Sequence, residues 1–383
     1  MAPKDKPYRV YRGGRAKGPA AQVIPRERPQ PEQQRDGRYR GPGPVPRKKR
    51  RWPRVIGILL LLVLVAGLAW GVLGYLAFRS GVNEANDRLP NGTRRALAAQ
   101  NGLLLTTPTN VLVLGIDTGG AREGRGRADA IMLVRSDPDD NRFARLSIPR
   151  DLRVQIPGRG TDKVNAAYAY GGPALAVDTV EAVTGLEVNH VVVVDFASFP
   201  VVIDALGGVT VEVPRRIVSN RFDCPYKTPD RCSRWQGWQF DRGSQEMSGR
   251  RALVYARIRT NRLDPSESDL TRVRRQQQVL QAIQGKAFSL GTFIRMPFIG
   301  DELVRPLATD LSAGELLQLG WRQKRTPGSQ TLNCNLGGEL QGSFIQGTEE
   351  NVSVIAMVTG ESAPQPPPPG TGPFGPGCRV GKG

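Results

Sequence analysis

An uncharged run from Val55 to Phe78 is the feature that most constrains the fold of this chain. Its 24 residues are bounded by Arg54 and Arg79. At about 1.5 Å per residue, a helix of this length spans roughly 36 Å, enough for a tilted crossing of a bilayer. A cleaved signal peptide is the alternative, but the run is too long, begins more than 50 residues into the chain and has no obvious small-residue cleavage site. The sequence therefore predicts one uncleaved transmembrane helix over residues 55–78.

The positive charge of the chain is concentrated before this run. Residues 1–54 contain 17 Lys and Arg against four Asp and Glu, a net charge of +13 out of +19 for the whole chain. By the positive-inside rule this predicts a single-pass protein of the cell membrane, with a cytoplasmic N-terminus and an extracytoplasmic remainder. Nucleic-acid binding is the rival interpretation. Few aromatics, many Pro and Gly and no helical periodicity instead favour a disordered cytoplasmic tail that attracts anionic lipid, so no nucleic-acid partner is expected.

The four cysteines all follow the membrane run, which agrees with an oxidising location. Cys224 and Cys232 bracket a short Pro-containing loop that suits a local disulfide, and Cys334 and Cys378 would then pair. Three pairings are formally open. A zinc site is the alternative, but the chain has one histidine and no CxxC motif. That residue, His190, is interpreted as structural rather than as a catalytic base, so a Ser-His-Asp hydrolase has little support.

Composition divides the chain after the membrane run. Residues 79–105 are polar with Ala and Leu, which predicts an extracytoplasmic linker helix. Residues 106 to about 289 hold the densest strand and helix patterns, a further helix and strands continue to about residue 359, and residues 106–360 are predicted to form the main domain. Residues 361–383 are dominated by Pro and Gly, which is typical of a disordered or extended tail.

Apolar runs alternate with helical patterns inside the domain. Asn110–Ile116, Ala130–Val134 and Val188–Val194 are continuous runs of the kind found in strands covered on both faces. Pro173–Thr184 has Pro at a first helical position and Gly just beyond its end, which predicts a helix. Arg251–Ile258 is interpreted as a strand or as the start of a helix. Together these patterns predict an α/β fold, a three-layer α/β/α sandwich with a mixed central sheet, preceded by one transmembrane helix.

Charged side chains gather at the predicted strand ends. Asp117 follows the first apolar run, and Arg150 and Asp151 follow another predicted strand, Phe143–Ile148, which Pro149 ends. Ligands of open α/β sheets bind outside the carboxyl ends of the strands. Arg127 and Asp129 precede the second run, and they reach the same edge if that strand is antiparallel to the first. Guanidinium forks and carboxylates in such a set suit a pyrophosphate and a divalent metal.

A long helix is predicted from Asp269 to residue 288. Its first two turns place Asp269, Arg272 and Gln276 on one face, which becomes apolar in the next two turns. A groove with a charged mouth and an apolar floor has this pattern, and an ordinary amphipathic helix has it equally. Arg257 and Arg259 are two residues apart and would point the same way in a strand. No P-loop pattern is present, so an enzyme acting on nucleoside triphosphates is not supported.

Seven segments carry a family resemblance: NVLVLGIDT, RADAIMLV, LSIPRDLRVQIPG, DKVNAAYAYGG, VVDFASFPVVIDALGGV, YARIR and DLTRVRRQQQ. In this order they resemble the signature of the LytR-CpsA-Psr family, over roughly residues 110–280. The resemblance implies a phosphotransferase that moves a glycopolymer from a polyprenyl-pyrophosphate carrier to a peptidoglycan hydroxyl, forming a phosphodiester. It also implies an apolar tunnel for the lipid. The richness in Gly, Pro, Ala and Arg is typical of a high-GC bacterium such as an actinobacterium.

The resemblance also assigns roles to individual residues. Asp117 and Asp129 match carboxylates associated with Mg²⁺ or Mn²⁺. The catalytic positions match Arg127, Arg150, Arg257, Arg259, Asp269 and Arg272, and the substrate-binding positions match Lys163, Asn165 and Gln276. Asp269 is a candidate general base, with a helix N-cap as the alternative. Many members have an arginine just after the first aspartate, where this chain has Thr118-Gly119-Gly120, so Arg122 or Arg125 is the candidate replacement.

Two other functions remain open at this stage. Water in place of the sugar hydroxyl would make the protein a polyprenyl-pyrophosphate hydrolase. A non-enzymatic membrane regulator, with the basic tail contacting nucleic acid, belongs to a different class. In that case deletion of residues 1–50 would destroy function, whereas a transferase would be inactivated by changes in the exterior domain.

Overall fold

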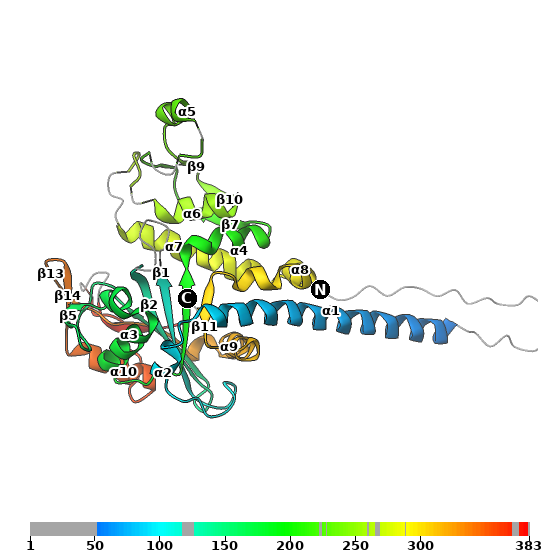
Figure 1. Cartoon of the computed structure of the whole chain (residues 1–383), viewed down its shortest axis with the longest axis horizontal. Coiled ribbons are helices and arrows are strands. Elements are labelled where there is room, and N and C mark those ends of the chain that lie inside the picture. The colour runs from blue at the N-terminus through cyan, green and yellow to red at the C-terminus, as the bar shows by residue number, and fades with distance from the viewer. Residues whose placement is uncertain are drawn as a thin grey trace, which may run out of the picture. The chain divides into compact units, whose positions relative to one another are not determined.

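The computed structural model describes residues 52–116, 126–221, 224–226, 228–258, 260–264, 269–287, 289–369 and 375–381. The chain divides into a unit of residues 1–57 and a unit of residues 58–383. The second unit contains the described strands and most of a long first helix (Figure 1).

The first helix, α1, runs from Trp52 to Arg88. Residues 54–88 form the one helix in the described part of the chain that is long and apolar enough to cross a membrane. The helix continues past the predicted end of the span at Phe78, and its last turns bury Val82 and Ala85 completely. A short helix, α2 (Thr93–Ala96), follows it. The predicted membrane segment and the beginning of the predicted linker are therefore one continuous helix.

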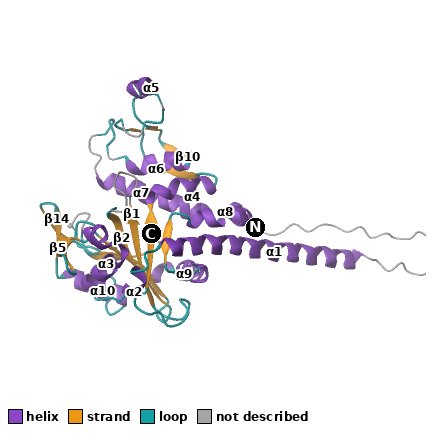
Figure 2. Cartoon of the chain, in the orientation of Figure 1, coloured by secondary structure: helices purple, strands orange, loops and turns teal. Residues whose placement is uncertain are grey.

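Seven strands form the central sheet in the order β11-β6-β1-β2-β3-β12-β15. In Figure 2 the strands are orange and the helices purple. The strand β2 pairs antiparallel with both β1 and β3, whereas β6 is parallel to β1 and β12 is parallel to β3. The sheet is therefore mixed, as predicted. In chain order the strands are β1 (Thr109–Ile116), β2 (Ala128–Asp137), β3 (Arg142–Ile148), β6 (His190–Asp195), β11 (Leu307–Thr309), β12 (Thr331–Asn335) and β15 (Gly377–Val380).

Helices cover both faces of this sheet. On one face, Leu112 and Leu114 of β1 belong to a core that includes α3 (Ala166–Thr184) and α10 (Glu350–Thr359). On the other face, Val111 and Val192 pack with residues of α9 (Ala313–Arg325). Alternate residues of a strand point to opposite faces of the sheet. Both sets of β1 side chains are apolar because helices cover both faces. The three-layer α/β/α prediction is confirmed.

A second core lies outside the sheet. It joins Val209, Phe240, Tyr255 and Val279, which come from four separate elements. The elements of this region are η1 (Phe196–Ser198), α4 (Phe199–Ala205), β7 (Val209–Val213), β8 (Ile217–Val218), α5 (Pro229–Arg234), β9 (Gln239–Phe240), β10 (Gly243–Met247), α6 (Gly249–Arg257), α7 (Asp269–Ala287) and α8 (Leu290–Val304). Elsewhere, β4 (Arg153–Ile156) pairs with β5 (Gly160–Lys163), β13 (Gly338–Gln341) pairs with β14 (Phe344–Gly347), and η2 spans Gly328–Gln330.

Three details of the secondary structure refine the expectations. The segment Arg251–Ile258 is helical up to Arg257, so the strand geometry considered for Arg257 is wrong. The helix predicted from Pro173 is the second part of α3, because Gly172, at φ +66°, breaks the helix just before the proline. The sheet also extends beyond the predicted domain end at residue 360, because β15 pairs with β12.

Both predicted disulfides are present. Cys224 bonds Cys232, and Cys334 bonds Cys378. The second bond joins two facing residues of β12 and β15. It therefore holds part of the Pro/Gly-rich C-terminal segment as the edge strand of the central sheet.

Candidate active site at the carboxyl edge of the sheet

One edge of the sheet collects the ends of several strands. The last residues of β1 and β6, Ile116 and Asp195, face each other in parallel register. Because β2 is antiparallel to β1, its beginning at Ala128 lies opposite Ile116. The end of β3, at Ile148, pairs with Ile131 of β2. Residues that precede β2 and residues that follow β3 therefore meet at the carboxyl edge of β1, as the sequence predicted.

A chain of ion pairs occupies this edge. Arg150 donates from Nη1 to Asp129 Oδ1 at 3.0 Å and from Nε to Asp151 Oδ2 at 3.3 Å. Lys163, the last residue of β5, donates from Nζ to the other oxygen of Asp151 at 2.8 Å. We call these four residues the edge cluster. Asp129 and Arg150 are 21 residues apart in sequence, and Asp151 and Lys163 are 12 apart. The sheet and the β4–β5 hairpin bring them together.

The electrostatics of the edge cluster favour the charged form of Arg150. Burial acts to lower the pKa of Arg150, but the charges of Asp129 and Asp151 and their hydrogen bonds outweigh it and raise the pKa above its ordinary value. Lys163 also lies over the ring of Phe344, with Nζ 5.4 Å from the centroid. The side chains of Arg150 and Asp129 are still 32% and 40% exposed, so an anion from solvent can reach them.

A second hydrogen-bonded pair lies beside the edge cluster. Tyr170 Oη donates to Asp162 Oδ2 at 2.5 Å, and the backbone N–H of Lys163 donates to Asp162 Oδ1 at 2.7 Å. These bonds lower the pKa of Asp162, and the positive charge of Arg127 adds to the effect. The electrostatic contact indicates that Arg127 lies near this hairpin, so another guanidinium flanks the cluster.

Asn165 connects the cluster to the helix behind it. It precedes the first residue of α3, it is buried, and its backbone N–H donates to the carbonyl of Arg150 at 3.3 Å. Its side-chain oxygen Oδ1 is buried and accepts no hydrogen bond from the described residues. The backbone contact braces the turn that carries Arg150.

Arg275 holds the end of α6 against α7, and the sequence analysis missed this role. Its side chain is only 5% exposed, and Nη1 donates to the carbonyl of Ile258, just after the end of α6, at 2.8 Å. Its guanidinium carbon lies 5.9 Å from the ring centroid of Tyr255. The helical periodicity placed Asp269, Arg272 and Gln276 on the polar face, without Arg275. The spacing of four between Arg275 and Val279, another buried residue, is the signal that would have found it.

Several predicted site residues lie partly or wholly outside this description. Asp117 and Arg259 fall outside the described residues. For Asp269 and Arg272 the structure describes the backbone, on α7, and not the side chains. Arg257 at the end of α6 and Gln276 on α7 are both half-buried. The edge cluster thus joins Asp129, Arg150 and Lys163 of the prediction.

The divalent metal stays a prediction. Asp129 offers a carboxylate at the exposed edge, and it is engaged with Arg150 through one oxygen. Within the described portion of the chain, no group of three or more His, Cys, Asp and Glu residues is placed so that it could hold a metal ion. The second predicted ligand, Asp117, is not among those residues.

His190 lies at the opposite end of the sheet from the edge cluster. It pairs with Val111 near the start of β1. Its Nδ1 lies 2.6 Å from Asp310 Oδ2, and the other carboxylate oxygen of Asp310 accepts from the N–H of Val191 at 2.8 Å. The buried contact ties β6 to the segment after β11, which confirms the structural interpretation of the histidine.

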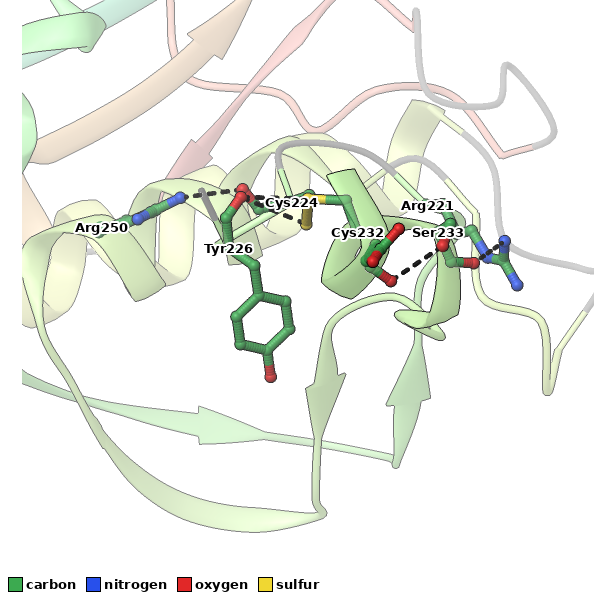
Figure 3. Close-up of a disulfide and its surroundings, with 7 residues drawn as sticks. Arg221, Cys224, Tyr226, Cys232, Ser233 and Arg250 are labelled. Carbon is green, nitrogen blue, oxygen red and sulfur yellow. Dashed lines mark hydrogen bonds between the residues drawn. A yellow bond between two sulfur atoms is a disulfide. The ribbon is translucent and has the colours of Figure 1, made fainter. Parts of the chain in front are cut away.

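A separate cavity of about 670 Å³ lies near the Cys224–Cys232 disulfide. Trp235 and Trp238 line it, with ring centroids 5.6 Å apart. Figure 3 shows that Arg250 reaches the carbonyl of Cys224, where Nη2 donates at 3.4 Å. None of the predicted site residues lines this cavity.

The fold and the edge cluster define a class of protein: an α/β/α domain behind a candidate membrane helix, with guanidinium and carboxylate groups at the carboxyl edge of its sheet. Residues 74–355 match the LytR_cpsA_psr family, and the chain belongs to that family.

Relatives with established names support this membership. The polyisoprenyl-teichoic acid–peptidoglycan teichoic acid transferase TagU of Oceanobacillus iheyensis is 32% identical over 286 residues, 71% of this chain and 81% of that protein. TagU of Bacillus subtilis is 31% identical and covers 82% of this chain and 97% of its own length. The crystal structure of B. subtilis TagV superposes with a TM-score of 0.51 at 27% identity, covering 67% of this chain and 97% of the other.

Proposed function

We propose that this protein is a membrane-anchored phosphotransferase that transfers a glycopolymer from a polyprenyl-pyrophosphate carrier to a hydroxyl of peptidoglycan. The named relatives are transferases of this type. The observation that carries the proposal to this chain is the edge cluster, in which Arg150 is held by two carboxylates beside Lys163 at a solvent-accessible sheet edge.

The reaction needs groups that bind and neutralise a pyrophosphate. The acceptor hydroxyl attacks the phosphorus nearest the glycopolymer, a phosphodiester forms, the phosphoanhydride bond breaks, and polyprenyl phosphate leaves with the bonding electrons. Phosphoryl transfer depends mainly on positioning and on offsetting negative charge. Arg150 and Lys163 place cationic groups at this edge, where they can bind the pyrophosphate. The proposed further cations are Arg127, Arg257, Arg259 and Arg272.

Asp129 has two roles in this scheme. Without substrate it pairs with Arg150, which keeps the guanidinium oriented. When the pyrophosphate takes that guanidinium, the carboxylate becomes available as a metal ligand. A magnesium or manganese ion held by Asp129 and Asp117 would offset charge on the phosphate oxygens. Asp269 is the proposed acceptor of the hydroxyl proton, and Asn165 and Gln276 are proposed to contact substrate.

We also propose the topology of the chain. The basic residues before α1 place the N-terminus in the cytoplasm and the domain outside. Two disulfides in the domain support an oxidising, extracytoplasmic location. In this arrangement the lipid-linked donor and the cell wall are both within reach of the domain.

A reconstituted assay tests the proposal against hydrolysis. Full-length protein in vesicles is given a lipid-linked glycopolymer donor with or without peptidoglycan, and the phosphorus-containing products are separated. Transfer predicts a glycopolymer–peptidoglycan phosphodiester that forms only with acceptor. Equal release of free glycopolymer phosphate in both reactions would assign the protein as a hydrolase instead. Arg257→Ala is expected to remove the product without unfolding the protein.

A further inference from the structure

The helix α8 presents bulky apolar side chains to its surroundings. Leu290 is 75% exposed, Phe293 59%, Ile294 54% and Phe298 73%. All four lie within nine consecutive residues of one helix. A contiguous apolar surface of this kind marks an interaction site rather than a face that remains in water.

The same helix packs directly on α1. Trp70 and Phe298 meet edge to face, with ring centroids 5.6 Å apart. A Cβ added at Gly74 of α1 would lie 3.2 Å from Met296 Cγ, so the two helices touch at that glycine. Small residues allow such close approach of helices in membranes.

From Gly74 onward the close contacts at glycines follow the same order along both helices. A Cβ added at Gly300 would lie 2.8 Å from the backbone nitrogen of Phe78, and one added at Gly81 would lie 2.5 Å from Val304 Cγ2. Later residues of α8 therefore face later residues of α1, and the helices run in the same direction. The beginning of α8, with Leu290 and Phe293, lies toward the middle of the predicted membrane segment.

The depth of α8 is set by a rigid connection. Beyond Gly81, α1 buries Val82 in a small core with Val304 and Ala313. The membrane helix is thus packed into the domain rather than joined by a loop. Gly300 lies against Phe78, the predicted end of the span, and Leu290 lies ten residues before Gly300, a rise of about 15 Å along a helix. The first half of α8 then lies at the depth of the outer leaflet.

The start of α8 is also built for an apolar medium, where unpaired backbone groups are unfavourable. Ser289 Oγ accepts from the N–H of Thr292 at 3.2 Å, which caps the helix. Thr292 Oγ1 donates to the carbonyl of Lys286 at 2.7 Å, so the turn before the helix is bonded as well. The charged residues of α8 lie mostly toward its end. Arg295 is the one charged residue of this helix before the acidic pair Asp301 and Glu302.

We infer that α8 inserts its first half into the outer leaflet beside α1, as a second membrane contact of the domain. The occupant of its apolar face is lipid, because that face is continuous with the exposed apolar surface of α1. The guanidinium of Arg295 lies against Gly207 of the domain, where a Cβ would be 2.9 Å from its Nη1. The helix α7 ends at Ala287, directly before α8, so this contact holds the helix of Asp269 and Gln276 close to the bilayer. The inference depends on the membrane span and not on the transfer reaction.

Spin labels measure this depth directly. Full-length protein with Phe293→Cys or, in a separate sample, Phe298→Cys is labelled with a nitroxide in vesicles of phosphatidylcholine and phosphatidylglycerol. The matched control is Val352→Cys, which lies on α10 and is 71% exposed. Collisions with oxygen, which concentrates in lipid, are compared with those of a water-soluble nickel chelate. Intact mass and circular dichroism verify the native disulfides and fold.

The inference predicts that oxygen collisions exceed nickel collisions at both α8 positions and that the order is reversed at the α10 control. An α8 label more accessible to nickel than to oxygen would overturn it. Dipolar broadening between labels of separate chains, with neither reagent reaching them, would also overturn it, because a second copy would then cover the face. Two α8 positions keep the test decisive if one variant fails to fold.

Discussion

Replacing Arg150 by lysine separates the role of the edge cluster in chemistry from its role in stability. Lysine keeps one positive charge but loses the planar fork that bonds Asp129 from Nη1 and Asp151 from Nε. Lys163 remains on Asp151 through its own bond. The substitution therefore changes the geometry of the cationic site much more than its charge.

The structure sets the size of the two effects. The side chains of Arg150, Asp129 and Asp151 are 32–40% exposed, and ion pairs with such exposure contribute about 0.2–1 kcal/mol each because solvent screens them. The expected loss of stability is about 1 kcal/mol, or about 3 °C in Tm for a domain of this size. Loss of one fixed donor to a developing anion slows catalysis by about 10²–10³-fold.

Two assays on the same preparation check this reasoning. Transfer from a lipid-linked donor to peptidoglycan is timed in vesicles, and thermal unfolding is followed by circular dichroism. Arg145→Lys is the matched control, because this arginine lies on β3, shortly before Arg150, but bonds Asn333 instead of the edge cluster. A transfer rate for Arg150→Lys within a few-fold of that of the unmodified protein would refute the proposed role of the edge cluster in binding the pyrophosphate. A Tm loss far above that of the control would mean that the cluster is chiefly structural.

Three further changes have outcomes set by single contacts. Arg275→Met keeps the bulk of the side chain but removes a buried charged donor, so unfolding free energy should fall by about 1.5–3 kcal/mol in urea titrations; no change would show that the bond is dispensable. Cys378→Ser opens the bond to Cys334 across a separation of 44 residues, and calorimetry should show a loss of about 4 kcal/mol, with an unaltered Tm contradicting this. Tyr170→Phe should raise the pKa of Asp162 in carboxyl NMR titrations, because the hydroxyl bond lowers it. A carboxyl group with a depressed pKa stabilises the fold above its unfolded pKa of about 4, and this stabilisation is lost as the pH falls through the folded pKa. The free energy of unfolding of the variant should therefore fall less on acidification. Identical carboxyl titrations of the two proteins would exclude the bond in solution.

Much of the fold was predictable because its signals are local. The apolar run before the domain forms a long exposed helix, and the continuous apolar runs form β1, β2 and β6 with both faces covered. The prediction failed for the strand option at Arg251–Ile258, where α6 forms instead. Tyr255 and Val254 of that segment are buried in the second core, and such burial suits helix and strand patterns equally in a short segment.

The candidate site was predictable by residue type and only partly by contact. The expectation that Asp129 and Arg150 reach one edge is correct, because antiparallel pairing of β2 with β1 and β3 follows from short connections. The bond of Lys163 to Asp151 depends on how the β4–β5 hairpin folds back, which no local pattern specifies. Arg275 was missed because a charged residue on a helix is normally solvated, and only its neighbours reveal its burial.

By itself the sequence determined the candidate membrane helix, the alternation of strands and helices and the types of charge available, since each depends on residues near one another in the chain. The tertiary structure alone decided that β15 closes the sheet through Cys378, that Arg275 caps the end of α6, and that α8 lies against α1. Those contacts join residues separated by 17 to more than 200 positions. Their pairing follows from the packing of whole elements, which local periodicity does not encode.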